Sequence, residues 1–185
     1  MEEDNFLIEG CKRNNHEAFE KLYQKYASKM KGVAFRYVND AALSEDIIQE
    51  AFIKVFVNIQ TFDTSGSFGG WLHRVVVNAA IDHFNKIKKQ NHKVVADLST
   101  ISENGHHEEV DNNYDYSMEE LVESISKLPE GYKLVFNMYV VDDFSHKEIA
   151  AALNITEGAS KSQLSKARGY LRNYLEKNKT VNHAR

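Results

Sequence analysis

Hydrophobic residues recur every three or four positions along most of the chain, and this spacing predicts helices rather than strands. The clearest run begins at His16 and predicts one long amphipathic helix, with apolar positions at Phe19, Leu22, Tyr23, Tyr26, Met30, Val33, Ala34 and Tyr37. Further helices are expected over residues 5–12, 41–59, 71–89, 118–128 and 130–141. We therefore predict an all-α fold.

Residues 91–117 have no sustained hydrophobic period and are polar and acidic. This segment predicts a flexible linker between two small helical domains, residues 1–90 and residues 118–185. The chain as a whole has a net charge of −4, but residues 91–117 alone carry −5 and residues 146–185 carry +5. Positive charge is thus concentrated in the last part of the chain, where it favours an anionic partner.

The stretch SHKEIAAALNITEGASKSQLSKARGYLR, from Ser145 to Arg172, predicts two helices joined by a tight turn. Ser145 and Glu148 have the spacing of a capping box, Asn154 ends the first helix and Thr156 caps the second. The second helix has one apolar side, opposite which we place the polar side chains Ser160, Lys161, Gln163, Ser165, Lys166 and Arg168. Hydroxyls, amides and cations reach phosphates and base edges in a major groove, so we predict a helix-turn-helix. The alternative is an αα-hairpin with a solvated polar face.

A loop from Thr61 to Gly70 is rich in Ser and Gly but carries Phe62 and Phe68. It precedes a helix that begins at Trp71 and has polar or basic positions at Arg74, Asn78, His83, Lys86, Lys88 and Lys89. Aromatic rings beside cations suit single-stranded nucleic acid, because bases stack on rings while cations hold the backbone. The alternative is a Trp71 that fills the core beside a solvated cationic helix end.

Asp46, Gln49 and Glu50 share one side of the helix expected over residues 41–59. Taken alone, three polar groups on one side of a helix indicate an ordinary solvated face.

Several function classes find little support in the sequence. No run of 18 apolar residues is present and the start, MEEDN, lacks the basic region of a signal peptide, so we expect a cytoplasmic protein without membrane insertion. The single Cys11 cannot form an internal disulfide, and its apolar neighbours favour a buried structural thiol. His106 and His107, followed by Glu108 and Glu109, lack metal-ligand spacing, so we expect no metal and no cofactor. No catalytic constellation is found, so we expect no enzyme activity.

Two blocks of sequence, read together, resemble the bacterial sigma factors, specifically the extracytoplasmic-function group. The first comprises AFEKLYQKYASKM, SEDIIQEAFIKVF and FDTSGSFGGWLHRVVVNAAIDHFNK, and it resembles the family's region two. The second is LPEGYKLVFNMYVVDDFSHKEIAAALNITEGASKSQLSKARGYLR, which resembles region four. The resemblance covers about residues 5–175, and the order of the blocks and the linker between them agree with it.

The resemblance implies a role for each group of polar residues. Asp46, Gln49 and Glu50 would dock on the clamp coiled coil of the β′ subunit of core RNA polymerase, and the β flap is a further expected contact. The −10 promoter element would be read and opened by Phe62, Phe68, Trp71, Arg74, Asn78, Asp82 and Lys86. The −35 element would be read by Ser160, Lys161, Gln163, Leu164, Ser165, Lys166 and Arg168. The linker would follow the path of the emerging RNA.

The chain departs from the family pattern in the second helix of the helix-turn-helix. Members commonly show G-T-V-K-S-R-L-x-R-A-R, whereas this chain has Gln163 and Lys166 in place of two arginines. A glutamine that faces a base can pair with adenine, so we expect Gln163→Arg to alter −35 preference. Asp143 also stands where a glycine is common.

The resemblance therefore implies a dissociable promoter-specificity subunit that binds core RNA polymerase and promoter DNA, and that an anti-sigma factor could sequester. Two other functions remain open on the residues alone. A stand-alone helix-turn-helix regulator would bind its operator tightly without polymerase. A metal or redox enzyme would depend on Cys11 or on His106 and His107.

Overall fold

The computed structural model describes residues 2–90 and 116–182. Within these ranges it is helical and contains no strand, which confirms the predicted all-α class. The chain divides into two compact units, Met1–Lys86 and Ile87–Arg185. Apart from Tyr116 and Ser117, the predicted linker lies outside the described residues.

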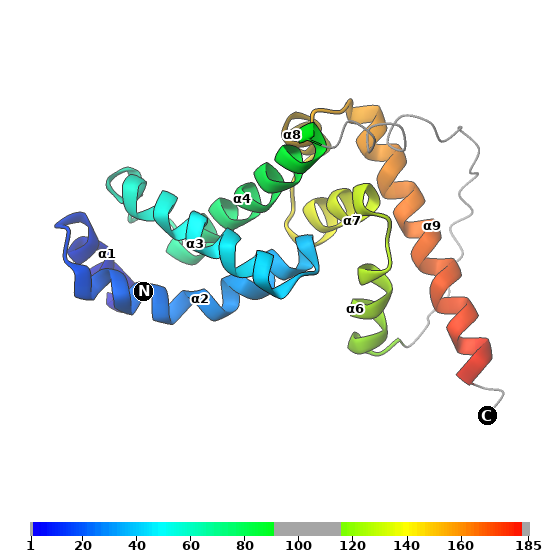
Figure 1. Ribbon diagram of the computed structural model, residues 1–185, viewed down its shortest axis with the longest axis horizontal. Helices are drawn as coiled ribbons and strands as arrows, with labels where there is room; N and C mark the ends of the chain where they lie inside the picture. The colour runs from blue at the N-terminus through cyan, green and yellow to red at the C-terminus, as the bar shows by residue number, and fades with distance from the viewer. Residues whose placement is uncertain (1, 91–115, 183–185) are drawn as a thin grey trace. The chain divides into compact units, whose positions relative to one another are not determined.

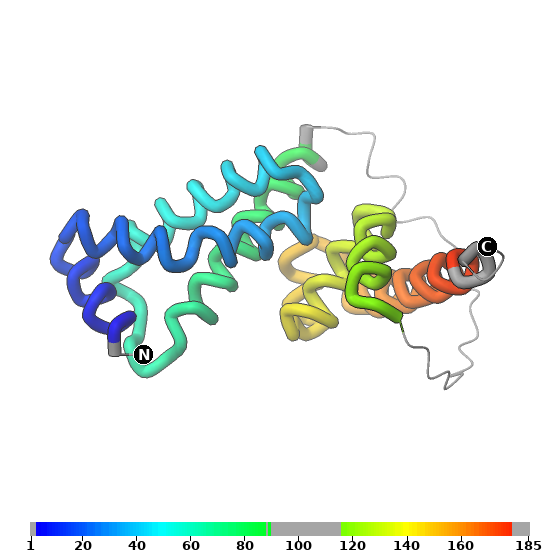
Figure 2. Tube along the Cα trace, turned by 90° about the horizontal axis from the view of Figure 1, so that it is seen from below, coloured from blue at the N-terminus to red at the C-terminus, as the bar shows by residue number. Residues whose placement is uncertain are grey.

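The first unit consists of four α-helices and one short 3-10 turn (Figure 1). They are α1 (Glu2–Lys12), α2 (His16–Val38), α3 (Ala41–Asn58), the turn η1 (Ile59–Thr61) and α4 (Phe68–Gln90). Helix α2 packs along both α1 and α3, and the tube view shows α1 and α3 lying beside it (Figure 2). The core of this unit is therefore built around α2.

Polar residues determine where these helices begin and end. Asn15 caps α2 by accepting hydrogen bonds from the backbone N–H groups of Glu17 and Ala18, at 2.9 and 3.2 Å. Asn39 ends α2 in the left-handed conformation, with φ 52°. Asp40 then caps α3 by accepting from the N–H of Leu43. These two adjacent residues make the turn between α2 and α3.

Two helix starts differ from the sequence predictions. Helix α1 begins at Glu2 rather than at residue 5, and α4 begins at Phe68 rather than at Trp71. The second difference arises because Ser67 serves as the cap of α4. Its hydroxyl accepts from the N–H of Gly70 at 3.3 Å and its carbonyl accepts from the N–H of Trp71 at 3.0 Å. Gly69 and Gly70 thus belong to the first turn of α4, and the loop is shorter than predicted.

The second unit consists of α6 (Met118–Ser126), α7 (Glu130–Phe136), the π-helix η2 (Asn137–Val141), α8 (His146–Leu153) and α9 (Glu157–Asn182). Helix α9 is the longest element and packs against α6, α7 and α8. The helix predicted over residues 130–141 is present, but its last five residues form the π-helix. Asp143, which follows it, has φ 56°, a conformation that favours glycine and that aspartate tolerates better than most residues. This explains why a glycine suits this position.

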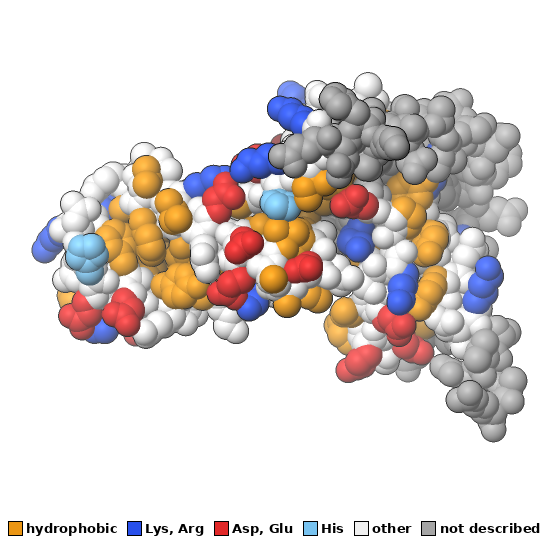
Figure 3. Space-filling view, viewed as in Figure 1, with side chains coloured by type: hydrophobic (Ala, Val, Ile, Leu, Met, Phe, Trp, Pro, Cys, Tyr) orange, Lys and Arg blue, Asp and Glu red, His pale blue; other side chains and the backbone are white. Residues whose placement is uncertain are grey.

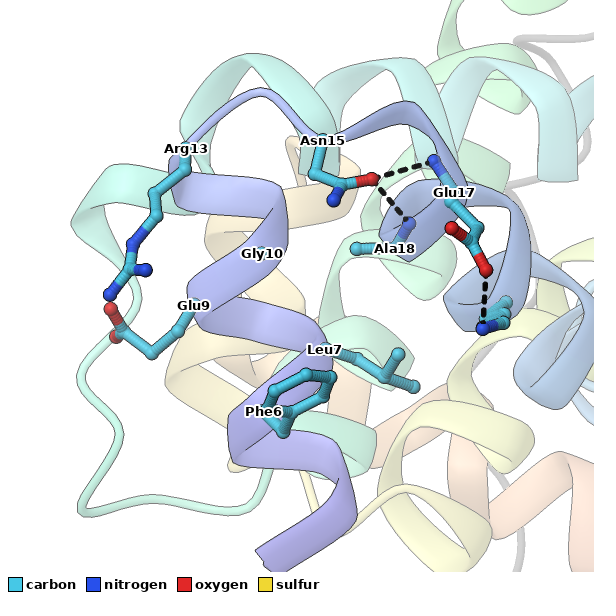
Figure 4. A pocket seen from close by; sticks show the side chains of 9 residues that line it. Phe6, Leu7, Glu9, Gly10, Arg13, Asn15, Glu17 and Ala18 are labelled. Atoms are coloured by element: carbon cyan, nitrogen blue, oxygen red, sulfur yellow. Dashed lines mark hydrogen bonds and ion pairs between the residues drawn. The ribbon is translucent and has the colours of Figure 1, made fainter.

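A pocket of about 440 Å³ opens beside the turn between α1 and α2 (Figure 4). Apolar Phe6 and Leu7 line it together with charged side chains, of which Glu17 and Lys21 pair with each other at 2.6 Å. Gly10 also lines it, and here α1 and α2 approach so closely that a Cβ on Gly10 would stand 2.7 Å from the Cβ of Ala18. Only glycine allows this approach.

We expect Gly10→Ala to lower the free energy of unfolding of the first unit by about 1–3 kcal/mol, because the added methyl overpacks the contact with Ala18. Gly32→Ala is the matched control. It lies inside α2 with no atom within 4 Å of the new Cβ, so the better helix propensity of alanine should raise stability by roughly 1 kcal/mol. Urea unfolding followed by circular dichroism measures both, and equal effects of the two substitutions would contradict the close approach.

Candidate nucleic-acid and protein-docking interfaces

Helices α8 and α9 form the predicted pair with a tight turn between them. Ser145 and Glu148 make both hydrogen bonds of the capping box, and Asn154 ends α8 with φ 54°. Thr156 caps α9, since its hydroxyl accepts from the N–H of Ala159 at 3.0 Å. Ile149 and Leu153 of α8 are buried, as is Ala167 of α9. The two helices thus form a helix-turn-helix whose second helix exposes its other side.

Three of the residues predicted to contact duplex DNA lie on the packed side of α9. Ser160 is fully buried, Gln163 is 6% exposed and Leu164 is 5% exposed. Ser160 and Gln163 come one helical turn before Leu164 and Ala167, so the same packing that buries these two apolar residues turns Ser160 and Gln163 inward. In this structure Ser160, Gln163 and Leu164 are therefore buried rather than on the exposed side of α9, and their contact with DNA, including the pairing of Gln163 with a base, stays a prediction.

The exposed side of α9 presents a row of small and cationic residues. Lys161 and Arg168 are exposed, and Ser165 and Lys166 are half-buried. Ser162 is also exposed and lies on this side, one turn before Lys166, although the sequence analysis did not include it. The exposure of Ser162 was predictable from the apolar period of Leu164, Ala167 and Leu171, because this period assigns Ser162 to the opposite side of the helix. We name Lys161, Ser162, Ser165, Lys166 and Arg168 the α9 face.

His146 connects the start of α8 to α9. Its Nδ1 lies 2.9 Å from the hydroxyl of Ser160, and its ring stacks on Tyr139 at a centroid distance of 4.4 Å and an angle of 20°. Burial lowers the pKa of His146 below its ordinary value, and the cations of Lys161 and Arg168 lower it further, whereas Glu157 acts in the opposite direction. The neutral imidazole is therefore the form that this packing favours.

Helix α4 carries the second group of predicted nucleic-acid contacts. Arg74, Asn78, Asp82 and Lys86 are exposed and Trp71 is half-buried. Their spacing of three and four residues brings them onto one side of the helix, which we name the α4 face. A half-buried ring beside amide, guanidinium and ammonium groups can stack on a base and hold its backbone.

Phe62 and Phe68 do not lie on that surface. They are 6% and 4% exposed, and their rings pack edge to face on each other at 5.5 Å. Trp71 contacts both rings, at 5.2 and 5.8 Å, and Tyr26 of α2 contacts Phe68 at 5.3 Å. Direct contact of Phe62 and Phe68 with nucleic acid stays a prediction, and in this structure both rings are buried. The two rings instead form the packing that supports Trp71 and the start of α4.

Helix α3 presents an exposed side on which polar residues are followed, along the helix, by apolar ones. Asp46 and Gln49 are exposed and Glu50 is half-buried. Ile53 and Val57 continue the same side at helical spacing and are 62% and 75% exposed. On the face drawn in Figure 3, acidic side chains gather on the first unit beside a broad hydrophobic area. We name Asp46, Gln49, Glu50, Ile53 and Val57 the α3 face, of which the sequence analysis found only the polar part.

Exposed apolar side chains one turn apart distinguish the α3 face from an ordinary solvated helix. Exposure of such a pair to water is unfavourable. Burying it against a protein partner contributes about 25 cal/mol of favourable free energy per Å² of apolar surface. Polar contacts of the neighbouring acids and amide would orient the partner on this face. This composition fits a protein partner better than nucleic acid, because a phosphate backbone would be repelled by Asp46 and Glu50.

A row of alternating charges links the α3 face to the α4 face. The Nζ of Lys54 lies 3.2 Å from Glu50 Oε1, one turn earlier in α3, and 3.0 Å from Asp82 Oδ2 in α4. The Nζ of Lys86 lies 3.8 Å from the same oxygen of Glu50. Burial opposes the charge of Lys54, but Asp82 and Glu50 more than offset this and raise the pKa of Lys54. Lys54 was not singled out from the sequence, because its partner Asp82 is 28 residues away.

The residues considered for metal or redox chemistry form no such site in the described ranges. Among residues 2–90 and 116–182, no group of three or more His, Cys, Asp or Glu side chains could hold a metal ion. Cys11 is buried, as predicted, and burial raises its pKa to about 11, which suppresses the thiolate. His106 and His107 lie outside the described residues. In the same ranges, no helix combines the length and apolar character that crossing a bilayer requires.

Comparison with known proteins matches both halves of the chain. Residues 22–90 match the family Sigma-70 region 2, and residues 118–171 match Sigma-70, region 4. The chain is 29% identical over 178 residues to the ECF RNA polymerase sigma factor SigW of Bacillus subtilis, covering 91% of this chain and 94% of that protein. It is 27% identical over 183 residues to the ECF RNA polymerase sigma-E factor of Escherichia coli, covering 94% of each chain.

A solved structure has the same fold. The sigma factor RpoE of Bartonella quintana, determined in complex with the anti-sigma factor NepR, superimposes with a TM-score of 0.51. The match covers 85% of this chain and 96% of that one, at 18% sequence identity. The α3 and α4 faces lie within the region matched at residues 22–90, and the α9 face lies within the region matched at residues 118–171.

The packing around His146 makes the second unit sensitive to pH. Because the pKa of His146 is lower in the folded chain, the unfolded chain binds the proton more readily, so stability rises with pH over this range. We expect the second unit to lose stability as the pH falls through about 6.5, the ordinary value for histidine. His146→Gln should remove this contribution and leave a shallower dependence.

Urea unfolding of wild type and His146→Gln at pH values between 5 and 8 gives the free energy of unfolding of both proteins. The difference between them isolates the contribution of His146, because both proteins share the other histidines. An NMR titration that gives His146 a pKa above 6.5 in the folded protein would contradict the assignment.

Proposed function

This chain belongs to the sigma-70 family of RNA polymerase sigma factors, within its extracytoplasmic-function group, and we propose which of its surfaces bind core polymerase and which bind the two promoter elements. Like other members, it binds core RNA polymerase and directs it to specific promoters, where it recognises the −10 and −35 elements. We assign residues 1–90 to region two, residues 118–185 to region four and residues 91–117 to the linker.

The observation that carries the assignment is the presence of both regions in one chain, in the family's order, over residues 22–90 and 118–171. A stand-alone regulator with a helix-turn-helix would need only the second. The first region supplies the α3 face, whose mixture of acids and exposed apolar residues suits a protein partner.

The α3 face is our proposed docking surface for the β′ clamp of core polymerase. Asp46 and Gln49 are exposed polar groups that orient the contact, and Ile53 and Val57 supply apolar area. The β flap is a second proposed contact, through region four.

The α4 face is our proposed surface for the −10 element. Trp71 offers a ring for stacking, Arg74 and Lys86 offer cations and Asn78 offers an amide. Taking a base out of the duplex costs a few kcal/mol, which contacts of this kind offset. Phe62 and Phe68 act indirectly, by supporting Trp71 from the core.

The α9 face is our proposed surface for the −35 element in the major groove. The small side chains of Ser162 and Ser165 allow α9 to approach the bases, while Lys161, Lys166 and Arg168 contact the backbone or guanine. Gln163 has a packing role in this scheme, since it lies among buried residues.

The chain carries out no chemistry in this proposal, since RNA synthesis belongs to the polymerase. The net charge of −4 disfavours binding of the free chain to DNA, and the polymerase supplies affinity by joining the two modest DNA contacts in one assembly. An anti-sigma factor is a further proposed partner, by analogy with the complex of the solved sigma factor that shares the fold.

Replacing Asp46, Gln49 and Ile53 together by alanine should weaken binding to core polymerase at least tenfold, equivalent to about 1.4 kcal/mol, because it removes the polar and part of the apolar contact at once. The matched control is Glu20→Ala with Gln24→Ala, an acid and an amide on the exposed side of α2 that bond to each other at 3.2 Å. Fluorescence titration of labelled protein with core polymerase gives both dissociation constants.

If the α3 variant binds as tightly as wild type, the docking surface is elsewhere. If wild type itself fails to bind core polymerase, and instead holds duplex DNA tightly on its own, the chain acts as a stand-alone regulator.

Lys161→Ala should weaken binding of the assembled holoenzyme to promoters that depend on a −35 element and reduce the slope of log affinity against log salt by roughly 1, the loss of one phosphate contact. Lys177→Ala is the control, because Lys177 is exposed on the same helix about four turns further along. Filter binding at several salt concentrations measures the slopes, and identical slopes for the two variants would place Lys161 away from the backbone.

A further inference from the structure

Lys54, in the charged row between the α3 and α4 faces, has no part in the scheme above, although its partners belong to two of the proposed surfaces. The members of this row alternate in sign in the order Lys86, Glu50, Lys54 and Asp82. Lys54 is the central member, since it lies 3.2 Å from Glu50 and 3.0 Å from Asp82 and belongs to neither face itself.

We infer that Lys54 is a positioning residue that couples polymerase docking to −10 recognition: in the free chain it pairs with both Glu50 and Asp82, and once polymerase engages Glu50 it neutralises Asp82 alone. This inference rests on the proposed roles of the α3 and α4 faces. It adds a residue that contacts neither partner directly but affects both.

The effect on docking follows from competition for one carboxylate. Glu50 Oε1 is contacted by both Lys54 and Lys86, so a cation of the polymerase must share or displace them. All these side chains are about 40% exposed or more, so the exchange needs no opening of the core. Each pair is worth little in water, and the competition is correspondingly modest.

The effect on promoter DNA follows from the charge of Asp82. An aspartate on the α4 face would repel the phosphate backbone that Arg74 and Lys86 attract. Lys54 sits 3.0 Å from Asp82 and cancels this charge from the neighbouring helix. When polymerase engages Glu50, Lys54 is left with Asp82 alone, so docking completes the neutralisation just where DNA is to be held.

Lys54→Met tests the inference, because methionine keeps an unbranched apolar stem and removes the charge. We expect the affinity for core polymerase to rise roughly two- to fivefold, because a competitor for Glu50 is gone. We expect promoter opening at saturating polymerase to fall by at least as much, because Asp82 is no longer neutralised. Lys54→Arg, which restores the cation, should return both values toward wild type.

The opposite signs separate this role from a structural one. Loss of a merely structural ion pair would lower both core affinity and promoter opening. The control is Lys25→Met, which breaks the 2.9 Å pair with Asp4 between α1 and α2, and we expect it to lower both values at most slightly. Asp82→Asn supplies the second test. In that background Lys54→Met should reduce promoter opening much less than it does in wild type, because the charge to be neutralised is absent.

Core affinity is measured by fluorescence titration and opening by permanganate reactivity of thymines at the −10 element, at saturating core polymerase. Suppose that wild type binds core polymerase and opens the promoter. A Lys54→Met variant that then loses both core affinity and promoter opening, or changes neither, overturns the coupling role and leaves the proposed function intact. An equal loss of opening in the Asp82→Asn background also overturns it. Wild type that does not bind core polymerase would overturn the proposed function itself, and the coupling with it.

Discussion

Each long helix of this protein can bury only one side, and that constraint determines which polar residues reach a partner. In α9, Leu164 and Ala167 are buried, and this orients Ser160 and Gln163 inward and Lys161 and Ser162 outward. In α3, burial of Ile48, Phe52 and Val55 leaves Asp46, Gln49, Ile53 and Val57 in water. The functional surfaces are thus the complement of the core, and a substitution that shifted the buried side would move the surface with it.

The same constraint explains how far the sequence could go. The helices were predictable because apolar periods are long and capping residues such as Ser145, Asn154 and Asp40 have local partners, within three or four positions. The helix-turn-helix was predictable for that reason. The start of α4 was not, because Ser67 precedes two glycines, which ordinarily indicate a loop. The π-helix after Phe136 has no sequence signal that we recognised.

The surfaces were only partly predictable, for reasons that differ between residues. The burial of Gln163 was not predicted, because its polarity favours the surface whereas its position one turn before Ala167 places it on the packed side. The burial of Phe62 and Phe68 was not predicted, because aromatic residues in a polar stretch resemble a binding loop. Tyr26, which is distant in sequence, and the nearby Trp71 complete a core around them. Ile53 and Val57 were missed because an exposed apolar pair reads as core in sequence. The pairing of Lys54 with Asp82 depends on how α3 packs on α4, which no local pattern contains.

In the proposed function the two regions act together, through core polymerase, on promoter DNA. Its most direct test is transcription in vitro from a genomic fragment library of the source organism, with purified core polymerase and this protein, followed by mapping of the RNA 5′ ends. We predict that the protein creates new, discrete start sites that share sequence elements near −10 and −35, and that neither component produces them alone. If no start site depends on adding the protein, the account is contradicted.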